Sequence, residues 1–177
     1  MSRERVTFWL DDQGYMVTPD GFRVQGLNDG TASYDATVVN GVLTYTQIAT
    51  PPSGIGDIKV DFDISIGNGL TNSTGGAYTD AEVEAGKPTL QSFSVDQQGN
   101  VILSLSNGDT FVRGQVLMQN FNDPSALVRQ GNNIFSGQAA AGPVGGIALS
   151  ATNNAPGSNG LGRIQSGTVR AIKRRPE

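Results

Sequence analysis

The chain has 177 residues and a formal net charge of −4, and it contains neither cysteine nor histidine. The absence of these two residue types excludes Ser-His-Asp and Cys-His nucleophilic sites, thiolate or imidazole zinc sites and disulfide bonds. Charged residues make up 16% of the chain and glycines number 24, a balance typical of turn-rich β-proteins. We therefore predict an all-β protein with a single β-rich body domain of short strands and hairpins, one short helix and long glycine-rich loops.

The first 26 residues alternate short apolar stretches with turn signals. Val6 to Leu10 and Tyr15 to Val17 are separated by the turn Asp12-Gln13-Gly14. A second turn at Asp20-Gly21 is followed by a further short apolar stretch over 22–24. Because Asx-Gly pairs supply the positive φ angles of tight turns, this opening segment is predicted to form a β-meander.

Two stronger strand patterns follow. Thr37 to Val39 and Val42 to Ile48 flank Asn40-Gly41, which predicts a hairpin with a two-residue turn because both turn positions tolerate left-handed conformations. The stretch from Ile58 to Ile66 alternates apolar and polar residues, the pattern of a strand with one apolar face and one wet face. Small and polar residues then predict a surface loop over 67–87.

The second half of the chain begins with a predicted three-stranded meander over Ser92 to Val95, Val101 to Leu105 and 111–118. Asp123 is a helix N-cap residue followed by proline, which predicts one short helix over Ser125 to Gln130. This helix is the only one that the sequence predicts.

The remainder is expected to be mostly loop. Gly, Ala, Ser and Asn dominate 136–162, which is predicted to wrap the surface as an extended loop before a last strand near Ile164 to Val169. The β-rich domain is therefore expected to occupy 1–169. The basic residues of 170–177 are predicted to form a disordered tail.

Acidic residues offer the main candidates for chemistry. Asp57, Asp61 and Asp63 could form a carboxylate pair or a hard-cation site, but a solvated face that blunts strand-edge pairing is the favoured interpretation. The acidic body argues against a nucleic-acid partner because it repels phosphates. No apolar run is long enough for a membrane span, and the N-terminus has no signal-peptide core. No cofactor, metal or small-molecule substrate is expected.

The segment from Phe121 to Phe135 resembles a motif of the bacterial flagellar hook and basal-body rod proteins. It reads F-N-D-P-S-A-L-V-R-Q-G-N-N-I-F, and the family pattern has a phenylalanine, an N/D-P pair, a leucine and G-N-N-L-F before a small-residue stretch. Ser136 to Gly142 is similar to that stretch. Such an order is hard to obtain by chance.

Two further segments are similar to the same family. Leu10 to Gly26 resembles its early hairpin, D-x-x-G-Y-L-V followed by D-G and V-x-G, and Ser92 to Gln119 resembles its strands with D-x-x-G-x-I and S-N-G. Asn107-Gly108 and Leu161 to Gly167 favour a hook-type protein over a distal rod protein. The resemblance gives structural roles to the following motif residues: Phe121, Pro124, Leu127, Gly131, Asn132, Asn133, Phe135, Gly14, Tyr15, Asp20, Gly21 and Gly26.

The resemblance implies a structural subunit and no enzyme. In this interpretation Phe121, Leu127, Ile134 and Phe135 are four apolar anchors that dock the motif onto the sheet. The expected function is a subunit, or a fragment of one, of the hook or basal-body rod, in a helical tube that transmits torque. Its partners would be copies of itself and neighbouring axial proteins. The expected location is the flagellum, reached by the flagellar export route without a cleavable signal peptide.

The chain also departs from the family pattern. Both chain ends of family members form long helices, whereas only residues 1–5 precede the first expected strand here and 170–177 follow the last, so we expect these helices to be absent. The alternative function is a free-standing β-rich binding module of adhesin or phage-tail type that uses the 67–87 loop. A hydrolase that uses carboxylates ranks third. Genes for other flagellar parts beside the gene for this chain would favour the first function over the second.

Overall fold

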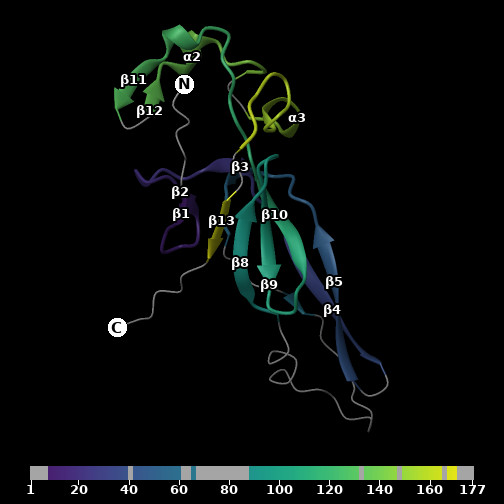
Figure 1. The fold of residues 1–177 in the computed structure, drawn as a ribbon. Coiled ribbons are helices and arrows are strands. Elements are labelled where there is room, and N and C mark those ends of the chain that lie inside the picture. Colours follow the sequence, from purple (N-terminus) through teal and green to yellow (C-terminus); the bar gives the residue numbers. More distant parts are fainter. Residues whose placement is uncertain are drawn as a thin grey trace, which may run out of the picture.

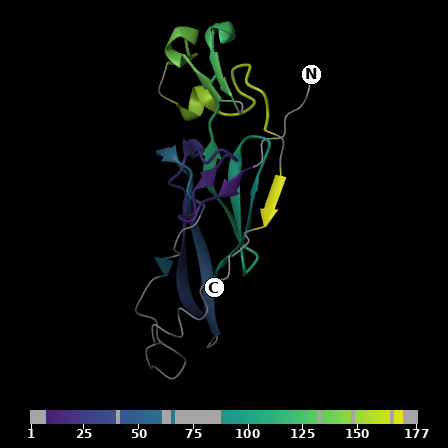
Figure 2. The same cartoon turned by 90° about the vertical axis from the view of Figure 1, so that its left-hand side faces the viewer.

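The computed structural model describes residues 8–39, 42–60, 65–66, 88–131, 134–146, 149–164 and 167–170. The molecule is elongated, and its strands are arranged in several sheets along its length (Figure 1). A view turned by 90° shows the same long shape (Figure 2). The all-β class predicted from the sequence is confirmed. In the described ranges, no helix is both long enough and apolar enough to span a membrane.

A six-stranded sheet forms the centre of the molecule. Every pairing between its neighbouring strands is antiparallel. In order across the sheet, the strands are β13 (Gly167–Arg170), β8 (Leu90–Val95), β9 (Asn100–Leu105), β10 (Thr110–Val116), β3 (Gln25–Leu27) and β6 (Ile55–Asp57). Strands β8, β9 and β10 form the meander predicted from the sequence. Buried and half-buried residues alternate along β9, as the two-residue period of a strand requires.

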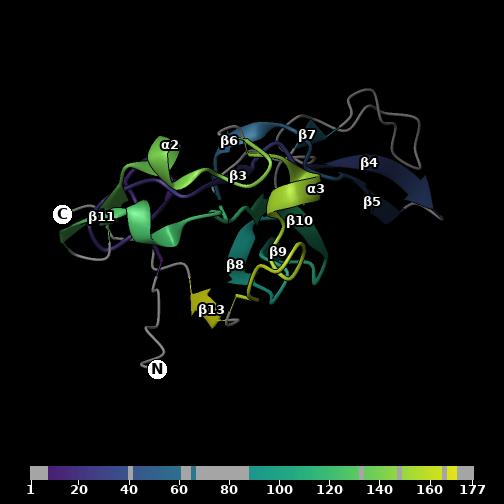
Figure 3. The same cartoon turned by 90° about the horizontal axis from the view of Figure 1, so that it is seen from above.

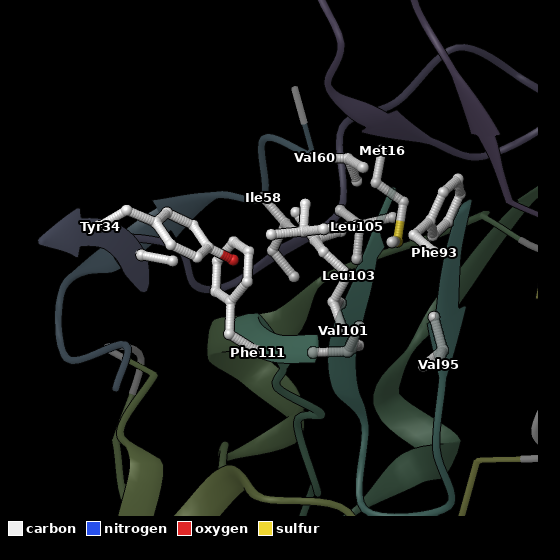
Figure 4. Packing of buried hydrophobic residues seen from close by; sticks show 13 residues of the cluster. Met16, Tyr34, Ile58, Val60, Phe93, Val95, Val101, Leu103, Leu105 and Phe111 are labelled. Atoms are coloured by element: carbon white, nitrogen blue, oxygen red, sulfur yellow. The ribbon is translucent and has the colours of Figure 1, made fainter. Parts of the chain in front are cut away.

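The N-terminal hairpin contributes to the main core together with this sheet. Strands β1 (Trp9–Leu10) and β2 (Met16–Val17) pair antiparallel, as the predicted meander requires. The predicted stretch over 22–24 continues this meander, because Arg23 forms an antiparallel bridge with Val17 and the Val24 nitrogen donates to the Met16 carbonyl at 2.8 Å. The chain then continues into β3, which pairs with β10 and β6. Side chains from the hairpin and the sheet point toward one another in the core (Figure 4). Its fully buried apolar members include Met16, Ile58, Val60, Phe93, Val101, Leu103 and Leu105.

The alternating segment from Ile58 to Ile66 is not one continuous strand. Strand β6 ends at Asp57, and the amide nitrogen of Val60 donates to the Gly14 carbonyl at 2.8 Å, in a turn of the N-terminal hairpin. The Met16 nitrogen also donates to the Ile58 carbonyl at 2.9 Å, so residues 58–60 pair antiparallel with residues 14–16 beyond the end of β6. Residues 61–64 lie outside the described residues. Strand β7 (Ser65–Ile66) pairs parallel with β4 (Thr31–Val39).

Strand β4 forms a long hairpin with β5 (Val42–Thr50), which extends from the central sheet at one end of the molecule (Figure 1). The two strands pair at all nine positions, from Thr31↔Thr50 to Val39↔Val42. This register confirms the predicted hairpin and its two-residue turn, although residues 40–41 themselves lie outside the described residues. Seen from above, the hairpin projects away from the end that carries β11 (Val128–Gly131) (Figure 3).

The segment after β10 corrects two sequence predictions. The predicted helix over Ser125 to Gln130 is wrong, because a 3-10 turn, η1 (Pro124–Ala126), ends at an extended Leu127, and β11 then pairs with β12 (Ile134–Ser136). The predicted extended loop over 136–162 contains two short helices, α2 (Gln138–Ala141) and α3 (Ala151–Asn154). The predicted loop over 67–87 and the end of the predicted tail, 171–177, lie outside the described residues.

Candidate functional site

The motif residues form two separate groups in the structure. Gly14, Tyr15, Asp20, Gly21 and Gly26 lie in the N-terminal hairpins and β3. The other described motif residues lie at one end of the molecule, in the unit formed by residues 121–131 and 134–146, which we call the distal unit (Figure 1). The motif asparagines at 132–133 lie outside the described residues. The sequence resemblance therefore joins two structural regions and does not mark one compact site.

The first group begins with a turn organised by Asp11. Its carboxylate Oδ1 accepts hydrogen bonds from the backbone nitrogens of Gln13 at 2.9 Å and Tyr15 at 2.8 Å. Gly14 adopts a φ of 79°, which a residue with a Cβ rarely adopts. The turn at Asp20-Gly21 closes with a 2.9 Å hydrogen bond from the Gly21 nitrogen to the Thr18 carbonyl. Both turns serve the backbone path of the N-terminal hairpins.

Tyr15 lies in a cluster of charged side chains. The guanidinium of Arg23 stacks 3.8 Å from the centroid of its ring, a cation–π contact. Arg23 also forms ion pairs with Asp11 at 3.5 Å and Asp57 at 3.4 Å. Asp57 is therefore an ion-pair partner, and residues 61–64, which carry the other two candidate carboxylates, lie outside the described residues. In the described ranges, no three His, Cys, Asp or Glu side chains gather as metal ligands.

Gly26 marks the closest approach of β3 to β10. A Cβ built at Gly26 would lie 2.0 Å from the Gln115 carbonyl oxygen, and one at Gly114 would lie 2.5 Å from the Leu27 carbonyl oxygen. Neither position has room for a side chain, because both obstacles are backbone atoms. These two glycines allow the early strand and the late strand to pair, which holds the N-terminal third of the chain against the central sheet.

The second group does not fill the main core. Phe135, predicted as an anchor, is 47% exposed, and the neighbouring Val128 is 57% exposed. Phe121, Leu127 and Ile134 are only half-buried, and none of the predicted anchors belongs to the core cluster. The reason is that this segment folds as its own hairpin beyond the central sheet, where it has little apolar surface to pack on. The prediction that four anchors dock the motif onto the sheet is therefore wrong.

Local hydrogen bonds stabilise the distal unit instead. The amide nitrogens of Asn122 and Asp123 donate to the carbonyls of Gly142 and Ala141 at 2.9 and 3.0 Å. The Asp123 carboxylate caps η1 by accepting a 3.0 Å hydrogen bond from the Ser125 nitrogen. Hydrogen bonds from the Ser125 hydroxyl and nitrogen lower the pKa of Asp123. The capping signal was thus read correctly from the sequence, although the helix that it begins is only one turn long.

Asn154, at the end of α3, binds the segment that follows β10, and the sequence predictions did not include it. It is 2% exposed, and its Nδ2 donates to the Met118 carbonyl at 2.7 Å. Its Oδ1 accepts from the Ser150 nitrogen at 2.9 Å, and its carbonyl accepts from the Met118 nitrogen at 2.8 Å. Ser150 also caps α3 through the Asn153 nitrogen, and this Ser-x-x-Asn spacing is the one signal that could have revealed the short helix.

No family model matches the chain. The chain is 30% identical over 136 residues to the flagellar hook protein FlgE of Salmonella typhimurium, a match that covers 75% of this chain and 32% of the relative. It is 28% identical over 139 residues to FlgE of Escherichia coli, which covers 77% of this chain and 32% of that protein. The chain thus matches about a third of the length of these curated relatives. These matches support the resemblance to the flagellar hook protein family that the sequence motifs indicated.

Proposed function

We propose that this chain is a structural subunit of the bacterial flagellar hook, or a part of one, and that it contributes to a helical tube that transmits torque. The observation that carries the proposal is the match to flagellar hook proteins over 75% of the chain. This share is too large to fall within one hairpin or one sheet, so the likeness concerns the body of the protein as a whole.

The physical character of the body supports a load-bearing role. Its core joins strands from the N-terminal third and the second half of the chain, so that pulling on either part loads the same packed side chains. The distal unit and the β4–β5 hairpin lie toward opposite ends of the elongated molecule (Figure 1). In the proposed tube, such ends contact neighbouring copies and other axial proteins, and repetition of a head-to-tail contact builds a helical assembly. The proposed location is the flagellum, reached by flagellar export without a cleavable signal peptide.

A chimera tests this role. The segment of Escherichia coli FlgE that aligns with this chain is replaced by the chain, and the chimera is expressed in a strain that lacks its own hook protein. Hooks visible by electron microscopy support a structural role. The matched control carries Leu103→Asp, which places a charge in the core and is expected to abolish hooks. A chimera that is exported and folded but forms no hooks argues against the proposal.

A further inference from the structure

Two turns of the structure carry the same tripeptide, Ser-Asn-Gly, and both asparagines are exposed. One tripeptide lies at 106–108, between β9 and β10, and the other at 158–160, in the loop that follows α3 (Figure 1). An Asn-Gly pair can lose ammonia without an enzyme, because glycine has no side chain to hinder an attack of its backbone nitrogen on the asparagine side chain. The attack requires a backbone N–H that is not held in a hydrogen bond. The place of the pair within its turn therefore determines whether it reacts.

Asn159 and Gly160 are the two central residues of their turn. The turn closes with a 2.8 Å hydrogen bond from the Leu161 nitrogen to the Ser158 carbonyl, and the φ angles of Asn159 and Gly160 are 47° and 78°. Two positive φ angles define a type I′ turn, in which the fourth residue supplies the closing donor. The N–H of Gly160, the third residue, therefore takes no part in closing the turn. Within the described residues, the Gly160 nitrogen donates to no carbonyl or side chain.

The other tripeptide is shifted by one position along its turn. Gly108 is here the fourth residue, and its nitrogen donates the closing hydrogen bond to the Leu105 carbonyl at 3.0 Å. The side chain of Asn107 is also held. Its Oδ1 accepts from the Asp109 nitrogen at 3.1 Å, and its Nδ2 donates to the Asp109 carboxylate at 2.7 Å. An attack of the Gly108 nitrogen on this side chain must first break these three hydrogen bonds.

We propose that Asn159 is a site of spontaneous deamidation and that Asn107, in the same tripeptide, is protected from it. A base in the solvent takes the amide proton of Gly160, and the Gly160 nitrogen then forms a bond to Cγ of Asn159. The bond from Cγ to Nδ2 breaks, and Nδ2 takes up a proton and leaves as ammonia. A five-membered succinimide ring remains.

Water then opens the ring at one of its two carbonyls. Opening at the side-chain carbonyl gives aspartate with the ordinary backbone, and opening at the backbone carbonyl gives isoaspartate, in which the chain runs through the side chain. In either case one water molecule is consumed, one ammonia is released and one carboxylate is gained. The reaction involves only the chain and the solvent, so it does not depend on the proposed role in the hook.

The surroundings of Asn159 leave room for this ring. Its Nδ2 donates to the Asn153 carbonyl at 3.4 Å, longer than the usual N–H···O range of about 2.7–3.2 Å, so little is lost when this contact breaks. Apart from its chain neighbours, no atom lies within 4 Å of the position that a Cβ on Gly160 would take. The loop is closed below the turn by a 2.9 Å hydrogen bond from the Gly157 nitrogen to the Gly162 carbonyl. The modified chain should therefore keep its fold.

Tandem mass spectrometry of the folded chain, incubated in mildly alkaline buffer and then digested, tests the proposal. Asn159 should deamidate about tenfold faster than Asn107 or more, because reaction at Asn107 must first break three hydrogen bonds. Incubation in urea that unfolds the chain is the control. The two rates should then become similar, since both asparagines lie between a serine and a glycine. Equal rates in the folded chain, or a faster reaction at Asn107, overturn the proposal.

Asp109→Ala tests why Asn107 is protected. The substitution removes the acceptor of the Asn107 Nδ2 hydrogen bond and should raise the deamidation rate at Asn107 by about threefold or more. The rate at Asn159 in the same sample is the control, because it should stay unchanged while the variant remains folded. An unchanged rate at Asn107 contradicts the protection that we assign to these contacts.

Hydroxylamine tests the ring itself, because it attacks a succinimide and cuts the chain there. The folded chain should be cut between Asn159 and Gly160 and should stay intact between Asn107 and Gly108, whereas the unfolded chain should be cut at both places. The Asn-Gly pairs at 40–41 and 68–69 lie outside the described residues, and the masses of their fragments distinguish them from these two. A folded chain that is cut after Asn107 and not after Asn159 contradicts the proposal.

Discussion

The hydroxyl of Tyr34 donates a 3.0 Å hydrogen bond to the carboxylate of Asp109. Tyr34 lies on β4 and Asp109 directly precedes β10, so this bond fastens the long hairpin to the central sheet. Tyr34 is only 1% exposed, and its burial raises the pKa of its hydroxyl. The side chain of Tyr34 thus packs in the core and also links the β4–β5 hairpin to the central sheet.

Tyr34→Phe is expected to lower the free energy of unfolding by about 1–3 kcal/mol, because it removes a hydrogen bond to a charged group and keeps the ring. Urea denaturation measures the loss. Thr44→Val is the control, since Thr44 is an exposed residue of the same hairpin. The loss of its hydroxyl should change the urea midpoint little. Equal midpoints for Tyr34→Phe and the natural chain would show that the bond contributes nothing to the joint.

Gly26→Ala should destabilise the protein by about 1–3 kcal/mol or more, because the new methyl group would meet the Gln115 carbonyl and force β3 away from β10. Gly162→Ala is the matched control. No atom lies within 4 Å of the position that its Cβ would take. Thermal unfolding of both variants measures the difference. If Gly26→Ala melts at the temperature of the natural chain, the two strands are not as close as the structure places them.

Leu103→Ala and Phe135→Ala separate the main core from the distal unit. Leu103 is fully buried, so its truncation should cost about 2–5 kcal/mol. Phe135 is 47% exposed, so its truncation should cost about 1 kcal/mol or less. Guanidinium denaturation of the two variants gives both values. A larger loss for Phe135→Ala than for Leu103→Ala would restore the anchor role that the sequence suggested.

Lowering the pH should remove the contribution of Asp29 to the stability of the folded chain. Its carboxylate accepts hydrogen bonds from the backbone nitrogens of Ser53 and Gly54, which lower its pKa from the ordinary value of 3.8. A depressed pKa means that the stabilisation is present above pH 3.8 and is lost as pH falls through the lower folded value. The denaturant midpoints of the natural chain and Asp29→Ala should therefore differ at pH 7 and converge in acid. A gap that stays constant at all pH values would contradict a role for the charge.

The sequence predicts an element correctly where a single local pattern determines its structure. The β8–β10 meander follows from alternation, and the β4–β5 register follows from Asn40-Gly41. Pairings between distant segments leave no such local signal, so the contact of β3 with β10 was missed. The error over Ser125 to Gln130 has a different cause, because the Asp123 cap suits a single 3-10 turn as well as a longer helix.

For the motif residues too, the sequence predicts the local backbone geometry but not the packing between distant segments. The sequence correctly places Gly14 and Gly21 in tight turns, since such turns need positive φ angles. It does not distinguish an apolar residue in a core from one on a protruding hairpin, and Phe135 is the example. Asn154 could not be found from its residue type alone, because a buried asparagine becomes recognisable only when its partners are in place.

The most direct test of the proposed role is the location of the protein in the bacterium that encodes it. Hook–basal bodies are isolated and labelled with gold-conjugated antibodies raised against the purified chain. Gold along the hook, and none in a strain from which the gene is deleted, is the expected result. Hooks without gold, in cells where immunoblotting detects the protein, would contradict a structural role in the hook.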